Sequence, residues 1–154
     1  MIKTKTAFII FLLLSTIIFP YYILVLSINS DFFNSIIPGW NTTIIPVRLI
    51  SNLVKFIILS IVSFYYWKLS KTSNEIKLKK FIIHLALTIP AVVVAKLNLY
   101  ELVPLNLNDS DIILSQIKKV VYINMLLNIL FFIGQILFWI FYIKLQRTRI
   151  VIEK

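Results

Sequence analysis

The chain has 154 residues, of which 60% are hydrophobic and only 14% are charged, and its formal net charge is +10. A soluble globular protein carries about 45–50% apolar and roughly 25% charged residues. A chain this short cannot bury such an apolar excess in its own core, so the composition predicts one integral membrane domain over residues 1–154. It excludes a soluble enzyme and a disordered chain. Because cysteine is absent, disulfide scaffolds, thiolate metal sites and redox dithiols are excluded too.

Four apolar stretches approach or exceed the roughly 20 residues that a helix needs to cross a bilayer. They cover about residues 7–27, 47–67, 81–99 and 120–143. Because these runs do not alternate with polar residues, they favour helices over the strands of a membrane barrel. We therefore expect an all-α membrane protein with four transmembrane helices packed as a helical bundle.

The first stretch follows two lysines, as the apolar part of a signal peptide would. Its apolar run is longer than the usual 7–15 residues and no small-residue cleavage site follows it, so we expect a retained span. Pro20 and Pro90 are expected to kink their helices, because proline removes a backbone donor and clashes with the preceding turn. With two glycines and no GxxxG pattern, the bundle is expected to pack through large side chains and not by close backbone contact.

The distribution of basic residues predicts the orientation. With the N-terminus in the cytoplasm, four spans return the C-terminus there. The cytoplasmic side then carries most of the 16 basic residues, namely Lys3, Lys5, Lys68, Lys71, Lys77, Lys79, Lys80, Lys144, Arg147, Arg149 and Lys154. We therefore expect a multi-pass protein of a bacterial cytoplasmic membrane, with both termini cytoplasmic. These scattered charges are typical of attraction to anionic lipids, at about 1 kcal/mol per residue, and do not indicate nucleic-acid binding.

Lys55 lies inside the second predicted span, and an ionisable residue at that depth is a functional hypothesis by default. Arg48, Asn52 and Lys55 are spaced i, i+4 and i+7, so they share one helix face. Such a stripe could hold an anionic headgroup, a phosphate or a carboxylate of a protein partner. The alternative is that Lys55 snorkels, with its stem along lipid and its ammonium at the outer interface.

A second polar stripe lies in the fourth predicted span, where Asn124, Asn128, Gln135 and Tyr142 fall near one helix face. Amides inside lipid should find hydrogen-bond partners across a helix interface, so this face is the predicted bundle interior. Helix packing is the simpler interpretation of the stripe. The alternative is a polar conduction path.

Three remaining features have simple structural interpretations beside their functional ones. Trp40, in the outer loop PGWNTT, either contacts a partner or ligand or anchors an interfacial loop. His84 has no cysteine or carboxylate near it in the sequence, so we expect an interfacial histidine and not a metal or haem ligand. The segment 68–80 is expected to be a polar connector on the cytoplasmic side.

The predicted spans contain no constellation for nucleophilic, acid–base or metal chemistry. We therefore expect a protein without its own catalytic site and without a cofactor. The first functional hypothesis is an accessory or structural subunit of a larger cell-membrane complex, which implies a protein partner in the membrane. The alternative is a small homo-oligomeric channel, permease or permeabilising protein, in which the amide stripe would line a pore.

Overall fold

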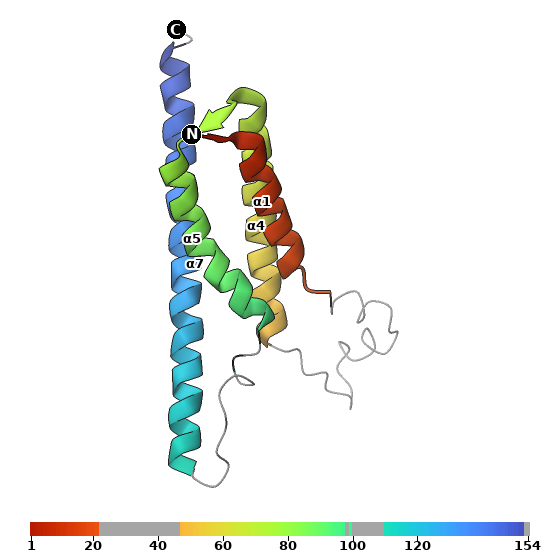
Figure 1. Cartoon of the computed structure of the whole chain (residues 1–154), viewed down its shortest axis with the longest axis vertical. Helices are drawn as coiled ribbons and strands as arrows, with labels where there is room; N and C mark the ends of the chain where they lie inside the picture. Colours follow the sequence, from red (N-terminus) through yellow and green to blue (C-terminus); the bar gives the residue numbers. More distant parts are fainter. Residues whose placement is uncertain (22–46, 98, 100–109, 153–154) are drawn as a thin grey trace, which may run out of the picture.

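The computed structural model describes residues 1–21, 47–97, 99 and 110–152. The elements in chain order are β1 (Ile2–Lys3), α1 (Thr4–Ile18), α4 (Val47–Thr72), β2 (Glu75–Ile76), α5 (Leu78–Lys96) and α7 (Ser110–Ile152). The prediction of an almost entirely helical protein is confirmed (Figure 1).

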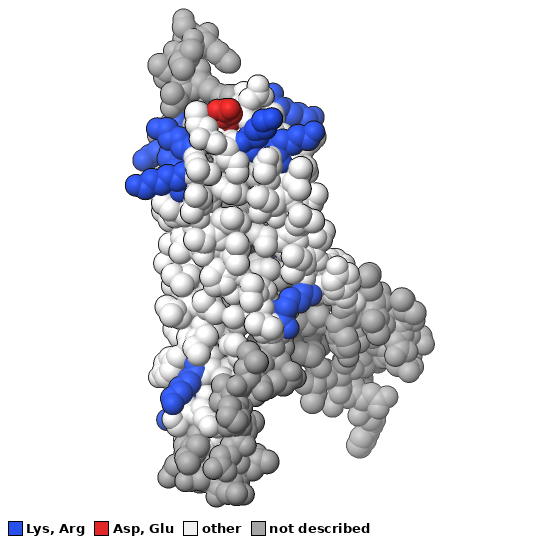
Figure 2. Space-filling view, viewed as in Figure 1, with Lys and Arg blue, Asp and Glu red and all other residues white. Residues whose placement is uncertain are grey.

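The helices form two packed pairs, α1 against α4 and α5 against α7, and α1 also contacts α5. Figure 1 shows the N-terminus, the α4–α5 connection and the C-terminal part of α7 at the same end of the bundle. Lysines gather there above a belt of uncharged side chains (Figure 2). We call this end the charged end. Its lysines with described side chains are Lys3, Lys5, Lys68, Lys71, Lys77, Lys79, Lys80 and Lys144.

Within the described residues, three helical segments are long and apolar enough to cross a membrane: Leu49–Thr72, Leu78–Lys96 and Ile113–Gln146. They correspond to the second, third and fourth predicted spans. Helix α4 begins at the predicted residue 47 and runs beyond residue 67, and α7 runs beyond both of its predicted boundaries. Helix α5 begins before residue 81 and ends at Lys96, not at residue 99. Hydropathy marks the part of a helix that can lie in lipid, whereas hydrogen bonding continues a helix through charged residues into water.

The first predicted span differs from the expectation. Helix α1 has 15 residues and ends at Ile18, and residues 22–27 lie outside the described part of the chain. Pro20 therefore follows the end of this helix and does not kink a longer one. Proline disfavours the helical conformation in the residue before it, and Phe19 is accordingly extended, with φ −49° and ψ 128°. Pro90, by contrast, lies inside α5.

The segment between α4 and α5 is more than the polar connector that was predicted. Strand β2 pairs antiparallel with β1, with Ile2 opposite Ile76 and Lys3 opposite Glu75. Ile76 is buried, which a connector made only of polar, solvated residues would not provide. The pairing ties the start of the chain to the α4–α5 connection at the charged end.

Thr4 fixes this junction and supplies a first prediction. It is fully buried, its backbone N–H donates to the carbonyl oxygen of Asn74 (3.0 Å), and its hydroxyl donates to that of Ser73 (2.6 Å). Thr4→Val keeps the shape but leaves the Ser73 carbonyl without this donor, which should cost about 1 kcal/mol. We expect faster hydrogen exchange of the β2 amides in Thr4→Val. The exposed Thr6 provides the control, and Thr6→Val should leave the exchange of the β2 amides unchanged. If Thr6→Val accelerated this exchange as much as Thr4→Val, the role given to Thr4 would be contradicted.

Helices α5 and α7 approach closely at Gly134, contrary to the expectation of packing through large side chains alone. A Cβ atom added to Gly134 would lie 3.0 Å from Cβ of Leu87 and 3.7 Å from Oγ1 of Thr88. A single glycine at the contact is enough for such an approach, and no GxxxG repeat is required.

Candidate functional site

Four buried side chains that carry polar groups gather at one place inside the bundle, which we call the histidine cluster. It consists of Tyr66 on α4, His84 and Thr88 on α5, and Gln135 on α7. Each of these residues is at most 4% exposed. Buried polar groups are costly unless they are hydrogen-bonded, so the partners of these four side chains decide whether the cluster stabilises the bundle.

The hydrogen bonds of the cluster form a chain with one consistent direction. The amide of Gln135 donates from Nε2 to the carbonyl oxygen of Phe131 (3.3 Å) and to Oγ1 of Thr88 (3.2 Å). Its Oε1 must then accept from Nε2 of His84 (3.1 Å). The other ring nitrogen, Nδ1, carries no proton in this arrangement and accepts from the hydroxyl of Tyr66 (3.1 Å).

The chain of hydrogen bonds closes at the backbone of α5. The Thr88 hydroxyl donates to the carbonyl oxygen of His84 (2.8 Å). Every member of the cluster therefore has a partner, and the cluster joins α4, α5 and α7. Such fully satisfied buried networks specify one packing arrangement of the elements that they join.

Aromatic rings complete the cluster on both faces of the imidazole. The ring of Phe11 on α1 stacks on that of His84 at 4.3 Å between centroids, and the ring of Phe138 on α7 stacks at 5.0 Å. All four helices therefore meet at His84.

The interpretation of His84 as an interfacial histidine is wrong, because its ring is 3% exposed and lies inside the bundle. The sequence offered one signal for this burial. His84, Thr88, Ala91 and Ala95 recur at helical spacing and make up one buried face of α5. A position near the end of a span does not by itself show which way a ring points.

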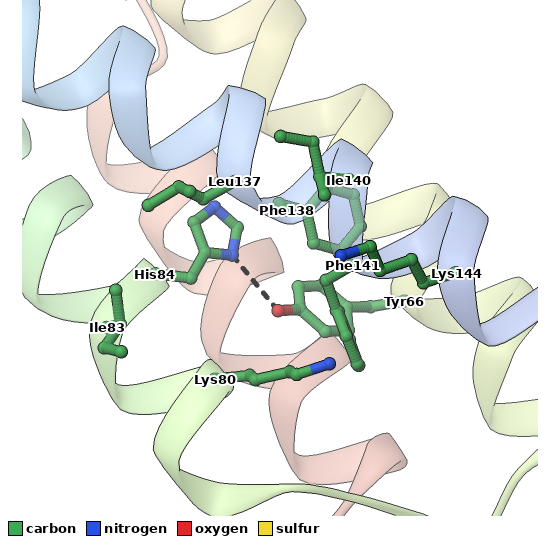
Figure 3. A pocket seen from close by; sticks show the side chains of 9 residues that line it. All are labelled: Tyr66, Lys80, Ile83, His84, Leu137, Phe138, Ile140, Phe141 and Lys144. Carbon is green, nitrogen blue, oxygen red and sulfur yellow. Dashed lines mark hydrogen bonds between the residues drawn. The ribbon is translucent and has the colours of Figure 1, made fainter.

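A pocket of about 210 Å³ lies beside the histidine cluster, between α5 and α7 (Figure 3). Its lining residues are Tyr66, Lys80, Ile83, His84, Leu137, Phe138, Ile140, Phe141 and Lys144. Sequence reasoning did not find this pocket, because its residues come from separate segments that only the packing of three helices brings together.

The residues of the predicted amide stripe lie in different surroundings. Gln135 belongs to the histidine cluster. Tyr142 is buried elsewhere on α7, where its ring lies 4.9 Å from that of Tyr65 and its hydroxyl accepts from Nε2 of Gln146 (2.6 Å). Asn124 and Asn128 are half-buried, and no side-chain hydrogen bond joins either of them to another residue in the described part of the chain.

The structure describes the side chains of only two of the three residues in the predicted cationic stripe, Asn52 and Lys55. Lys55 is 7% exposed, so protein and not lipid covers most of its side chain, contrary to the snorkelling alternative. Asn52 is half-buried one turn before it on α4. The side chain of Arg48 and the whole of Trp40 lie outside the described residues.

Among the described residues no group of three or more histidines, aspartates and glutamates could hold a metal ion. Comparison with protein-family models, with curated proteins and with solved structures gives no match. The chemistry of the described residues is therefore the basis for a functional proposal. The histidine cluster is suited to holding four helices in register, and the pocket is suited to an apolar group.

Proposed function

We propose that this protein is an accessory or structural subunit of a larger complex in the cell membrane and has no catalytic site of its own. We further propose a multi-pass arrangement in the cytoplasmic membrane of a bacterium, with both termini cytoplasmic. The lysines of the charged end support this orientation, because positively charged segments are retained on the cytoplasmic side.

The observation that carries the proposal is the pair of amides on α7. Asn124 and Asn128 are one helical turn apart within the segment of α7 that can cross a membrane. They are half-buried and without a hydrogen bond to the described residues. A polar side chain in a membrane helix gains about 0.6–2 kcal/mol from a hydrogen bond across a helix interface, so a helix of another subunit that supplies donors and acceptors would bind this face favourably.

The length of α7 agrees with a docking role. Its 43 residues extend over about 65 Å at 1.5 Å per residue, which is about twice the hydrocarbon thickness of a bilayer. Figure 1 shows α7 running past both ends of α5. The part that contains the two asparagines lies beyond the close contact at Gly134 and leaves much of its surface exposed to lipid or to a partner.

The experiment is quantitative co-purification of the full chain, tagged, from its native membrane in a mild detergent. Interhelical hydrogen bonds in membranes contribute about 0.6–2 kcal/mol each, so Asn124→Leu combined with Asn128→Leu should lower the recovery of a stoichiometric partner by about tenfold. Asn74→Leu, an equal change at an exposed residue between α4 and β2, is the control and should leave recovery unchanged.

Three outcomes would contradict the proposal. Full recovery of the partner by the double variant would show that Asn124 and Asn128 on α7 do not bind it. An equal loss with Asn74→Leu would show a general effect of removing amides. Purification of the chain as a homo-oligomer alone, with ion flux in liposomes, would favour the channel alternative.

A further inference from the structure

The α5–α7 pocket has apolar walls that face outward. Ile83, Leu137 and Ile140 line it and are 41–45% exposed. Phe138 and Phe141 line its inner side and are buried. The pocket therefore opens sideways, through the same apolar surface that would face hydrocarbon, and a membrane lipid could enter it without leaving the bilayer.

The rim of the pocket is cationic. Lys80 on α5 and Lys144 on α7 both line it, and Nζ of Lys80 lies 4.6 Å from the ring centroid of Phe141. In Figure 3 the two lysine side chains extend from opposite helices over the same opening. Both belong to the charged end, where lipid headgroups would lie if α5 and α7 cross the membrane.

The spacing of the lining residues along both helices gives the pocket the form of a groove that is cationic at the charged end and apolar along the rest of its length. On α5, Lys80 is followed by Ile83 at i+3, and on α7, Lys144 is preceded by Ile140 and Leu137 at i−4 and i−7. Residues at these spacings share a helix face. Each helix therefore places a lysine at the charged end beside apolar lining residues, namely Ile83 on α5, and Leu137 and Ile140 on α7.

The polar side chains that line the interior of the pocket, Tyr66 and His84, are already hydrogen-bonded within the histidine cluster. The hydroxyl of Tyr66 donates to His84, and the other ring nitrogen of His84 is bonded to Gln135. The volume of about 210 Å³ is smaller than the 300–1,000 Å³ typical of pockets for whole small molecules. It suits a length of hydrocarbon chain better than a complete polar ligand.

We propose that the α5–α7 pocket binds an anionic glycerophospholipid, with part of one acyl chain in the groove and the headgroup phosphate at the ammonium groups of Lys80 and Lys144.

The charge of the surface around the pocket supports an anionic lipid over a zwitterionic one. Glu75 is the only acidic residue whose side chain the structure describes, against eight lysines at the charged end. A zwitterionic headgroup would bring its own cation to this positive surface. The inference does not depend on a protein partner at Asn124 and Asn128.

The first test measures lipid binding to the purified full chain by native mass spectrometry, with phosphatidylglycerol as the probe and phosphatidylcholine for comparison. Lys80→Gln combined with Lys144→Gln should weaken phosphatidylglycerol binding by about tenfold or more, since each lysine near a headgroup contributes about 1 kcal/mol. Lys68→Gln combined with Lys79→Gln removes the same charge outside the pocket and should leave binding close to that of the unaltered protein. Equal loss in both pairs would overturn the proposal in favour of general charge attraction.

The second test separates an acyl chain in the groove from a headgroup at the surface. Ile140→Trp places a large ring in the pocket, whereas Ile136→Trp places it on the same exposed helix outside the pocket. We expect Ile140→Trp alone to reduce phosphatidylglycerol binding. Because both positions are exposed, both variants should fold, which unfolding curves in detergent would verify. Unchanged binding by a folded Ile140→Trp protein would overturn the proposal.

Discussion

Replacing His84 with phenylalanine should lower the free energy of unfolding in detergent by about 2 kcal/mol. The new ring can still stack between Phe11 and Phe138, so packing changes little. The Tyr66 hydroxyl and Oε1 of Gln135, however, each lose the ring nitrogen that they contact at 3.1 Å. A buried group without its partner costs about 1–3 kcal/mol, whereas hydrogen bonds inside a membrane protein average about 0.6 kcal/mol. Because two groups lose their partner, the expected loss of about 2 kcal/mol lies between the totals that these two figures give.

A second substitution should recover part of this loss. Removing both members of a buried hydrogen bond can be almost neutral, whereas removing one leaves the other unsatisfied. His84→Phe with Gln135→Leu should therefore be more stable than His84→Phe alone, although Gln135→Leu by itself destabilises the protein. Unfolding in mixed detergent micelles measures all three. Simple addition of the two losses would mean that the His84–Gln135 bond does not hold the helices together.

Gly134→Val should destabilise the bundle by about 2–3 kcal/mol, because overpacking a tight contact typically costs 1–3 kcal/mol and valine is branched at the atom that would clash. Even the first added carbon would lie 3.0 Å from Cβ of Leu87. The helices would have to separate next to the histidine cluster, so we also expect faster hydrogen exchange along α5. Gly134→Ala should show the same effects at a smaller size.

The partner of Gly134 gives the control for this prediction. Leu87→Gly removes the Cβ atom that an alanine at 134 would meet, so in a double-mutant cycle Leu87→Gly should reduce the cost of Gly134→Ala. Independent, additive costs would show that the close approach of α5 and α7 at this point does not limit the packing.

The extent of each helix was predictable only where hydropathy decides it. The stretches 47–67, 81–99 and 120–143 each lie within or close to an observed helix, because a long apolar run must satisfy its backbone internally. The end of α1 before Pro20 was not predicted, since an apolar run does not show where the backbone leaves the helical conformation. The pairing of β1 with β2 was also missed, because strands of two residues leave no periodic pattern.

The residues of the histidine cluster show what a sequence leaves out. Gln135 was expected to face the bundle interior, and it is buried there, but Asn128, one heptad before it, is only half-buried. Helical spacing gives the angle of a residue around its own helix, and it does not say where along that helix a neighbour still packs.

By itself the sequence predicted a helical protein with four apolar spans, and three of them coincide with helices that are long and apolar enough to cross a membrane. Those properties depend on composition and local spacing, which each segment carries alone. Only the tertiary structure decided that His84 lies at the meeting point of four helices and that Lys80 and Lys144 share one pocket. These relations depend on close approach between segments far apart in the chain, which the single contact at Gly134 helps to permit.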